Sequence, residues 1–164
     1  MKIFFSPTFL KTAKALYLWL IALCIGAIFS SGAFSASVLF NAESLGVNLP
    51  QYSAGILMSE IFSKLNILLL ILSFVIAFYE ILDAKLSQVR RIHKIVLGGS
   101  GAISVLCAFL FALYFSPKII ALQKLGESAT KSDEFLTLHA QSEWIFHILF
   151  FTLTLNFIYR ILRD

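Results

Sequence analysis

Charge is scarce in this sequence of 164 residues. Lys and Arg number 13 and Asp and Glu number nine, together 13% of the chain, while hydrophobic residues make up 59%. Soluble domains carry about 25% charged and roughly 45–50% apolar residues. The composition therefore excludes an ordinary soluble domain and makes the lipid bilayer the expected partner. The formal charge is +4, but the chain has no soluble domain with a basic surface. This excludes nucleic acid as a partner.

Cysteine and catalytic motifs are equally sparse. Cys24 and Cys107 both fall within apolar segments, so the chain lacks the disulfide framework of a small exported domain. The glycine-rich segment LGGSGAIS at 97–104 lacks the Lys-Ser/Thr ending of a phosphate-binding loop and opens an apolar run. No serine or cysteine lies in a recognisable nucleophile motif. The sequence favours a non-enzymatic protein, without deciding the question.

The apolar residues gather in four segments, 15–40, 53–82, 95–116 and 136–159. Each segment reaches the roughly 20 residues that span about 30 Å of hydrocarbon as a helix. We therefore predict an all-α integral membrane protein, an antiparallel bundle of four transmembrane helices in one domain covering residues 1–164. A cleavable signal ending in SSGAFSAS at 30–37 is the alternative for the first segment, but its apolar run continues to residue 40, which favours a retained helix. Pro117 is expected to end the third helix.

Basic residues mark the ends of these segments unequally. Lys and Arg resist translocation, so they gather on the cytoplasmic side. The connection at 41–53 has none, and the one at 117–134 has three that are offset by acidic residues. Most basic residues lie in the N-terminal segment, the 83–94 connection and the C-terminus. They are Lys2, Lys11, Lys14, Lys85, Arg90, Arg91, Lys94, Arg160 and Arg163. We predict a multi-pass protein of the cell (inner) membrane with both termini cytoplasmic.

A polar stripe interrupts the last apolar segment. His139, Glu143 and His147 are spaced four apart and so share one helix face. Counted from Arg160, Glu143 lies about 26 Å along the helix axis, and Lys64, counted from Asp83, lies about 28 Å along its own. Ionised side chains inside a bilayer need partners.

Three interpretations of this stripe remain open. The favoured one is a polar clasp formed by Lys64, Glu143 and Ser142, in which Lys64 bonds to Glu60 or Glu143 and no cofactor is needed. The second is a bound metal ion or haem, because imidazole, carboxylate and thiol groups suit transition metals; its candidate ligands are His139, His147, Glu143, Glu60 and Cys107. His139 and His147 are about 12 Å apart along one helix, too far to share one ion. The third is passage of protons or a small solute.

Two further sequence features concern association. Small residues line one face of the first helix around Gly26 and Gly32, and another at 97–104. Such faces let membrane helices approach closely. They permit a homo-oligomer or a membrane-protein partner.

Four motifs resemble a known family. They are GAFSASVLF at 32–40, LPQYSAGILMSEIF at 49–62, SPKIIALQ at 116–123 and FLTLHAQS at 135–142. Together they are similar to small four-helix membrane proteins of the transmembrane protein 205-like type, which share domain of unknown function 4149. The resemblance implies that the motif positions are Phe40, Ala54, Gly55, Phe62, Pro117, Leu138, His139 and Ser142. It implies the four-helix topology and no settled activity, so we expect a small integral membrane protein with a non-enzymatic accessory or stress-related role.

The orientation can be tested by cysteine labelling. In a background with Cys24 and Cys107 replaced by alanine, Gln88→Cys should react with a membrane-impermeant maleimide only after the cells are permeabilised. Asn48→Cys, in the connection without basic residues, should react in intact cells because that connection is expected outside. Labelling of position 88 in intact cells would contradict the predicted orientation.

Overall fold

The computed structural model describes residues 6–86 and 90–162, and this part of the chain contains helices and turns without a strand. The first span comprises α1 (Pro7–Phe29), a π-helical turn η1 (Ser30–Ser35) and α2 (Ala36–Phe40). The 3₁₀ turn η2 (Ala42–Leu45) leads to α3 (Gln51–Leu86). The third span comprises α4 (Arg91–Leu110), the π-helical turn η3 (Phe111–Phe115) and α5 (Ser116–Gln123). After the 3₁₀ turn η4 (Ala129–Lys131), α6 (Asp133–Leu162) completes the bundle.

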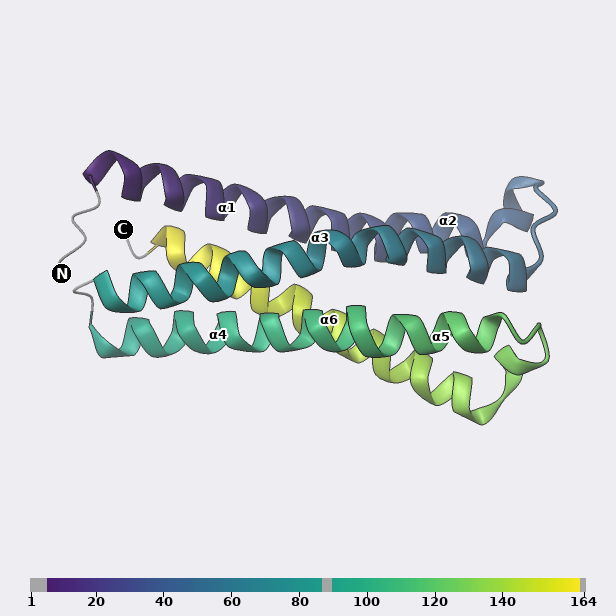
Figure 1. The fold of residues 1–164 in the computed structure, drawn as a ribbon. Helices are drawn as coiled ribbons and strands as arrows, with labels where there is room; N and C mark the ends of the chain where they lie inside the picture. Colours follow the sequence, from purple (N-terminus) through teal and green to yellow (C-terminus); the bar gives the residue numbers. More distant parts are fainter. Residues whose placement is uncertain (1–5, 87–89, 163–164) are drawn as a thin grey trace.

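Within the described residues, four helical spans are long and apolar enough to cross a membrane: Thr8–Phe40, Gln51–Leu86, Arg91–Gln123 and Asp133–Leu162. This confirms the predicted all-α membrane fold. The spans run alternately up and down, so that the start of α1 and the end of α6 lie at the same end of the bundle (Figure 1). We call this the terminal end and the opposite one the distal end. The first span and α4 each pack against α3 and α6, which places α3 and α6 at diagonal corners.

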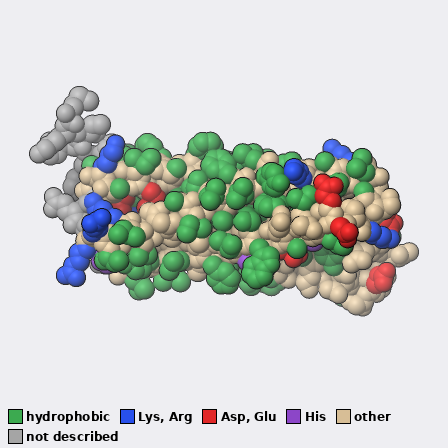
Figure 2. Space-filling model, turned by 90° about the horizontal axis from the view of Figure 1, so that it is seen from below, with side chains coloured by type: hydrophobic (Ala, Val, Ile, Leu, Met, Phe, Trp, Pro, Cys, Tyr) green, Lys and Arg blue, Asp and Glu red, His purple; other side chains and the backbone are tan. Residues whose placement is uncertain are grey.

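The interior of the bundle is apolar over most of its length. Ile21 and Cys24 from α1 meet Leu69 from α3 and Leu149 and Leu153 from α6, and all five are fully buried. Large hydrophobic side chains also cover the outside, as expected for helices in contact with lipid. On the face shown in Figure 2 they cover the middle of the molecule, while charged side chains lie toward its two ends. The chain is a multi-pass membrane protein.

The helices are longer than the apolar segments predicted them to be. α3 begins at Gln51 and α6 at Asp133 because polar residues continue a helix once it has left the hydrocarbon. The prediction that Pro117 ends the third helix is wrong. Pro117 lies in the first turn of α5, directly after the π-helical turn η3, where its missing amide hydrogen is tolerated and helical structure continues to Gln123.

The distal part of the bundle extends beyond one hydrocarbon thickness. Counted from Asp83, about 30 Å of α3 ends near Lys64, and residues 51–63 add about 20 Å more. The same length counted from Lys14 ends at Phe34 in η1, and counted from Lys94 it ends at Tyr114 in η3. By this count both π-helical turns lie near the far edge of an apolar layer of that thickness. We call residues 36–64 and 115–143 the distal segment.

Side chains of α3 pack tightly against one glycine of α4. A Cβ atom on Gly101 would lie 3.0 Å from Glu80 Cγ and 3.3 Å from Ile76 Cγ2, whereas one on Gly98 or Gly99 would meet nothing within 4 Å. The small-residue face predicted at 97–104 therefore serves packing within the chain at Gly101.

These three glycines make a matched set of variants. Gly101→Ala should lower the free energy of unfolding of the detergent-purified protein by about 1–3 kcal/mol, because the Glu80 and Ile76 side chains have to give way to the added methyl group. Gly98→Ala and Gly99→Ala should leave stability unchanged or raise it by about 0.5–1 kcal/mol, since alanine favours the helix. Equal effects at all three positions would contradict this account of the α3–α4 contact.

Candidate functional site

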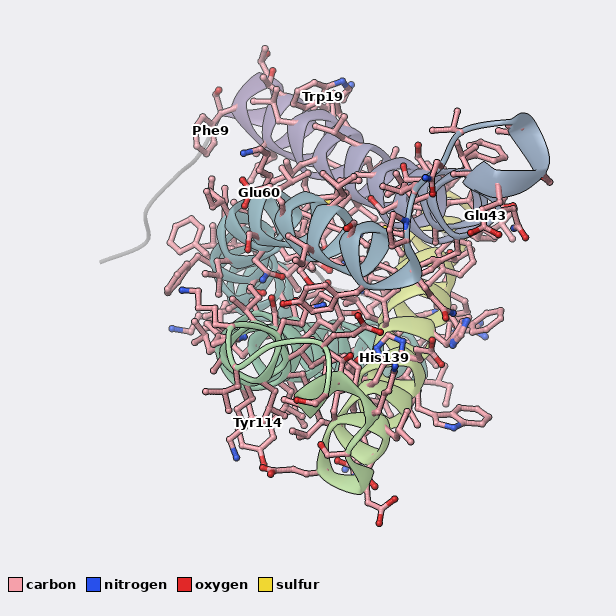
Figure 3. The ribbon with its side chains drawn as sticks, turned by 90° about the vertical axis from the view of Figure 1, so that its right-hand side faces the viewer. Phe9, Trp19, Glu43, Glu60, Tyr114 and His139 are labelled. Atoms are coloured by element: carbon pink, nitrogen blue, oxygen red, sulfur yellow. The ribbon has the colours of Figure 1, made fainter. Side chains whose placement is uncertain are left out.

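The polar stripe lies on one flank of α6, with His139 and Glu143 in the distal segment and His147 one turn nearer the terminal end. His139 Nε2 is 3.3 Å from Glu143 Oε1, and the two side chains are 48% and 59% exposed. The His139 ring stacks on Phe135, with centroids 5.9 Å apart. His147 contacts the ring of Trp144 edge-on at 6.5 Å, and both line a surface depression with Glu143 and Phe151. Figure 3 shows His139 on the side of α6 that faces the other spans.

The three residues of the predicted clasp do not come together. Lys64 Nζ is 2.6 Å from Glu60 Oε1, one turn away on α3, and both side chains are well exposed. Glu143 pairs with His139 instead, and Ser142 Oγ donates to the carbonyl of His139 at 2.7 Å. Lys64 and Glu143 share a depth, but their side chains are 75% and 59% exposed, so each lies on the outside of its own helix and not in the interior where α3 and α6 meet. Glu60 and Glu143 were the two partners expected for Lys64, and in the structure Lys64 pairs with Glu60.

The five candidate metal ligands are also dispersed. The described residues hold no group of three or more His, Cys, Asp or Glu side chains placed to bind one metal ion. Cys107 is buried in the apolar core together with Cys24, while Glu60 is exposed on α3. The positions of these residues along their helix axes are compatible with one shared metal site. Their side chains, however, point in different directions from their helices, so the five candidate ligands do not meet.

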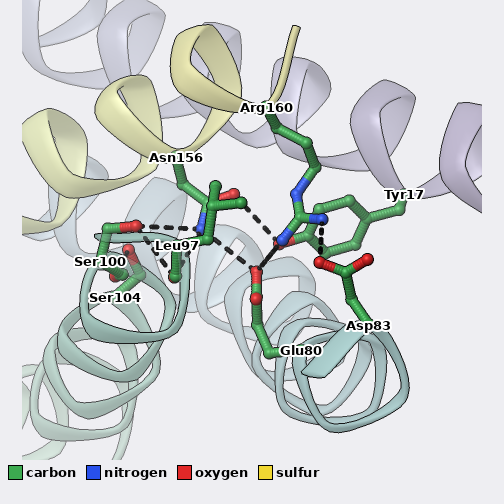
Figure 4. A network of polar contacts seen from close by, with 8 residues as sticks. All are labelled: Tyr17, Glu80, Asp83, Leu97, Ser100, Ser104, Asn156 and Arg160. Carbon is green, nitrogen blue, oxygen red and sulfur yellow. Dashed lines mark hydrogen bonds and ion pairs between the residues drawn. The ribbon is translucent and has the colours of Figure 1, made fainter. Parts of the chain in front are cut away.

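The principal buried polar site lies at the terminal end and involves Arg160. Its side chain is fully buried, although a basic residue near the end of the last helix is typical of an exposed anchor. Arg160 Nη2 is 2.6 Å from Glu80 Oε1, and Nη1 donates to Asp83 Oδ2 at 3.1 Å (Figure 4). The guanidinium carbon also lies 5.1 Å from the ring centroid of Tyr17 and 4.9 Å from that of Tyr79. Two acceptors and two aromatic faces therefore compensate this buried cation.

Neutral groups extend the contacts around Arg160. Tyr17 OH lies 2.9 Å from Glu80 Oε1 and 3.2 Å from Asn156 Oδ1. Asn156 Nδ2 lies within 3.2 Å of Glu80 Oε1 and of the Leu97 carbonyl, and 3.1 Å from Ser100 Oγ. We call these residues the Arg160 network: Tyr17, Glu80, Asp83, Leu97, Ser100, Asn156 and Arg160. Every one of the four spans contributes to it.

A second polar contact continues along the interface between α4 and α6. Ser104 Oγ donates to the Ser100 carbonyl and lies 2.9 Å from Thr152 Oγ1. Thr152 Oγ1 in turn donates to the carbonyl of Ile148 at 2.9 Å. Beyond this point the interior becomes aromatic, with Phe62, Phe111 and Phe146 packed with ring centroids 4.8–5.4 Å apart. The polar residues at the terminal end are thus separated from those of the distal segment.

Neutral side chains link the spans of the distal segment. Gln123 accepts from Ser59 at Oε1, at 2.7 Å, and its carbonyl accepts from Tyr52 at 2.8 Å. A Cβ atom on Gly55 would lie 3.4 Å from Gln123 Nε2, so this motif glycine leaves room for the amide. Asn66 Nδ2 donates to Ser116 Oγ at 2.8 Å. The motif residues Gly55 and Phe62 therefore have packing roles.

The sequence analysis missed the Arg160 network, although it contained two signals. Glu80 and Asp83 are three apart on α3, and Asn156 and Arg160 are four apart on α6, so each pair shares a helix face. Both pairs also lie near the ends of their helices on the terminal side. An acidic pair at this position also fits an ordinary charged helix border, and Arg160 was counted among the basic residues that mark the cytoplasmic side. Comparing positions along the helix axes, as was done for Lys64 and Glu143, would equally have placed the pair on α3 at the same depth as the pair on α6.

Replacing Arg160 should be costly. Arg160→Met leaves Glu80 without its cationic partner in a buried site, and we expect the free energy of unfolding in detergent to fall by roughly 3–5 kcal/mol. Arg160→Lys should lower the free energy of unfolding by a smaller amount, because an ammonium group keeps the charge but cannot reproduce the two directed contacts. Arg91→Met, at an exposed position, is the control and should change stability little. A loss no larger than that of the control would show that the buried contacts do not stabilise the fold.

Comparison with known proteins identifies the family but no individual relative. Residues 19–128 match a family described as Domain of unknown function (DUF4149). The match covers most of the first three spans and ends in the turn after α5, so the segment FLTLHAQS at 135–142 lies beyond it. No curated protein and no solved structure matches the chain. The match spans well over half of the sequence, and the chain therefore belongs to the family of the domain of unknown function DUF4149.

Proposed function

We propose that this protein is a non-enzymatic accessory factor of the cell (inner) membrane, of the transmembrane protein 205-like type, with both termini cytoplasmic. In this role it binds another membrane protein and modifies its assembly or its response to stress. The observation that carries the proposal is the Arg160 network. Its ionisable groups contact one another across three spans, and Asn156 connects them to α4, so the network serves to hold the bundle together.

The exposed flank of α6 is the part of the surface best suited to a partner. Trp144 is 71% exposed and lies beside Glu143 and His147 around one depression. Tryptophan is enriched among the residues that dominate binding energy in protein interfaces. The position near the end of the apolar layer also lets a partner offer both an apolar surface and a polar group. These features support binding of a membrane protein along α6.

Photo-crosslinking tests this role. A photoreactive p-benzoylphenylalanine at position 144 should give a discrete adduct with one membrane protein in native membranes. The same group at position 74 is the control, because Phe74 is similarly exposed, at 67%, but lies on α3. Loss of the 144 adduct in a Glu143→Gln, His147→Gln variant would locate the contact on this flank. Adducts with lipid alone at both positions would contradict the accessory role.

A further inference from the structure

We propose that His139 and Glu143 form a two-ligand site for a divalent transition-metal ion, with water completing the coordination. This inference goes beyond the accessory role and does not depend on it. It also differs from the five-ligand site considered from the sequence, because it needs only two side chains one helical turn apart. Both lie on α6, and no contribution from Cys107 or Glu60 is required.

The distance between the two donor atoms fits a shared ion. His139 Nε2 and Glu143 Oε1 are 3.3 Å apart. Zinc binds imidazole nitrogen at about 2.0–2.1 Å and carboxylate oxygen at about 2.0–2.2 Å, and two such ligands at a tetrahedral angle are about 3.3–3.4 Å apart. The pair thus has the spacing of two ligands of one ion.

The surroundings hold these donors in place and leave them accessible. The His139 ring stacks on Phe135, which lies one turn earlier on α6. The two side chains are 48% and 59% exposed, so the protein itself does not cover either donor. His139 lies about 31 Å from Arg160 along the helix, at the level where α6 leaves the apolar layer. Water is therefore present to fill the remaining coordination positions.

The donor set restricts the kind of ion. One imidazole nitrogen and one carboxylate oxygen suit Zn²⁺, Cu²⁺ and Ni²⁺, whereas a soft ion such as Cu⁺ prefers thiolate or thioether ligands. A site with two protein ligands keeps open positions, unlike a closed structural site with four. The ion should accordingly exchange readily with the medium, as in a capture site at the membrane surface.

Metal titration of the full-length protein tests the proposal. The detergent-purified chain is stripped with a chelator and titrated with Zn²⁺ by calorimetry, and with Cu²⁺ by electron paramagnetic resonance. We expect one saturable Zn²⁺ site and a Cu²⁺ spectrum with a single coordinated nitrogen. His139→Gln and Glu143→Gln should each weaken Zn²⁺ binding at least tenfold, the order of loss seen even for outer partners of metal ligands.

Two matched variants serve as controls. Glu60→Gln removes an exposed carboxylate that is likewise paired one turn away on its own helix, and it should change Zn²⁺ affinity less than twofold. His147→Gln removes the other histidine near Glu143 and should also leave binding intact. The proposal is overturned if no saturable site is found, if His139→Gln binds like the parent protein, or if His147→Gln abolishes binding. Thermal unfolding of each variant confirms that it is folded.

Discussion

A guanidinium buried in an apolar helical bundle has to find its partners inside the protein, and this requirement governs the terminal end of the structure. Arg160 is fully buried, and an ion left unpaired in such an environment costs several kcal/mol. Its acceptors come from α3, while Tyr17 adds a ring and a hydroxyl from α1. Asn156 then connects the same carboxylate to α4. The depth and rotation of all four spans are thereby specified at one end.

The distal segment is held differently. Its interhelical contacts are between neutral groups, such as Ser59 with Gln123 and Asn66 with Ser116, which contribute less than charge-assisted ones. Two π-helical turns mark its boundary with the apolar layer, and such turns frequently occur at functional sites. The exposed ionisable groups His139 and Glu143 also lie here. The bundle therefore combines an end that fixes the fold with an end that presents polar groups to the surroundings.

Much of the fold follows from the sequence, because hydrophobic length alone defines the four spans. The sites are harder to predict, since depth along a helix can be counted from one residue to the next but the direction of a side chain depends on how helices pack. Lys64 and Glu143 illustrate this, as they share a depth but both lie exposed on the outside of their helices. Arg160 shows the converse, because its position near a helix end suggested an exposed anchor. Pro117 adds a local case, in which a preceding π-helical turn lets a proline continue a helix that it was expected to end.

The central claim is that Arg160 and Glu80 stabilise the bundle through direct contact. A double-mutant cycle with Arg160→Met and Glu80→Met, measured as the free energy of unfolding in detergent, tests it most directly. We predict that the double variant is much less destabilised than the sum of the two single variants, because removing both partners leaves neither charge uncompensated. Strictly additive losses would contradict the account and would mean that each residue contributes through other contacts.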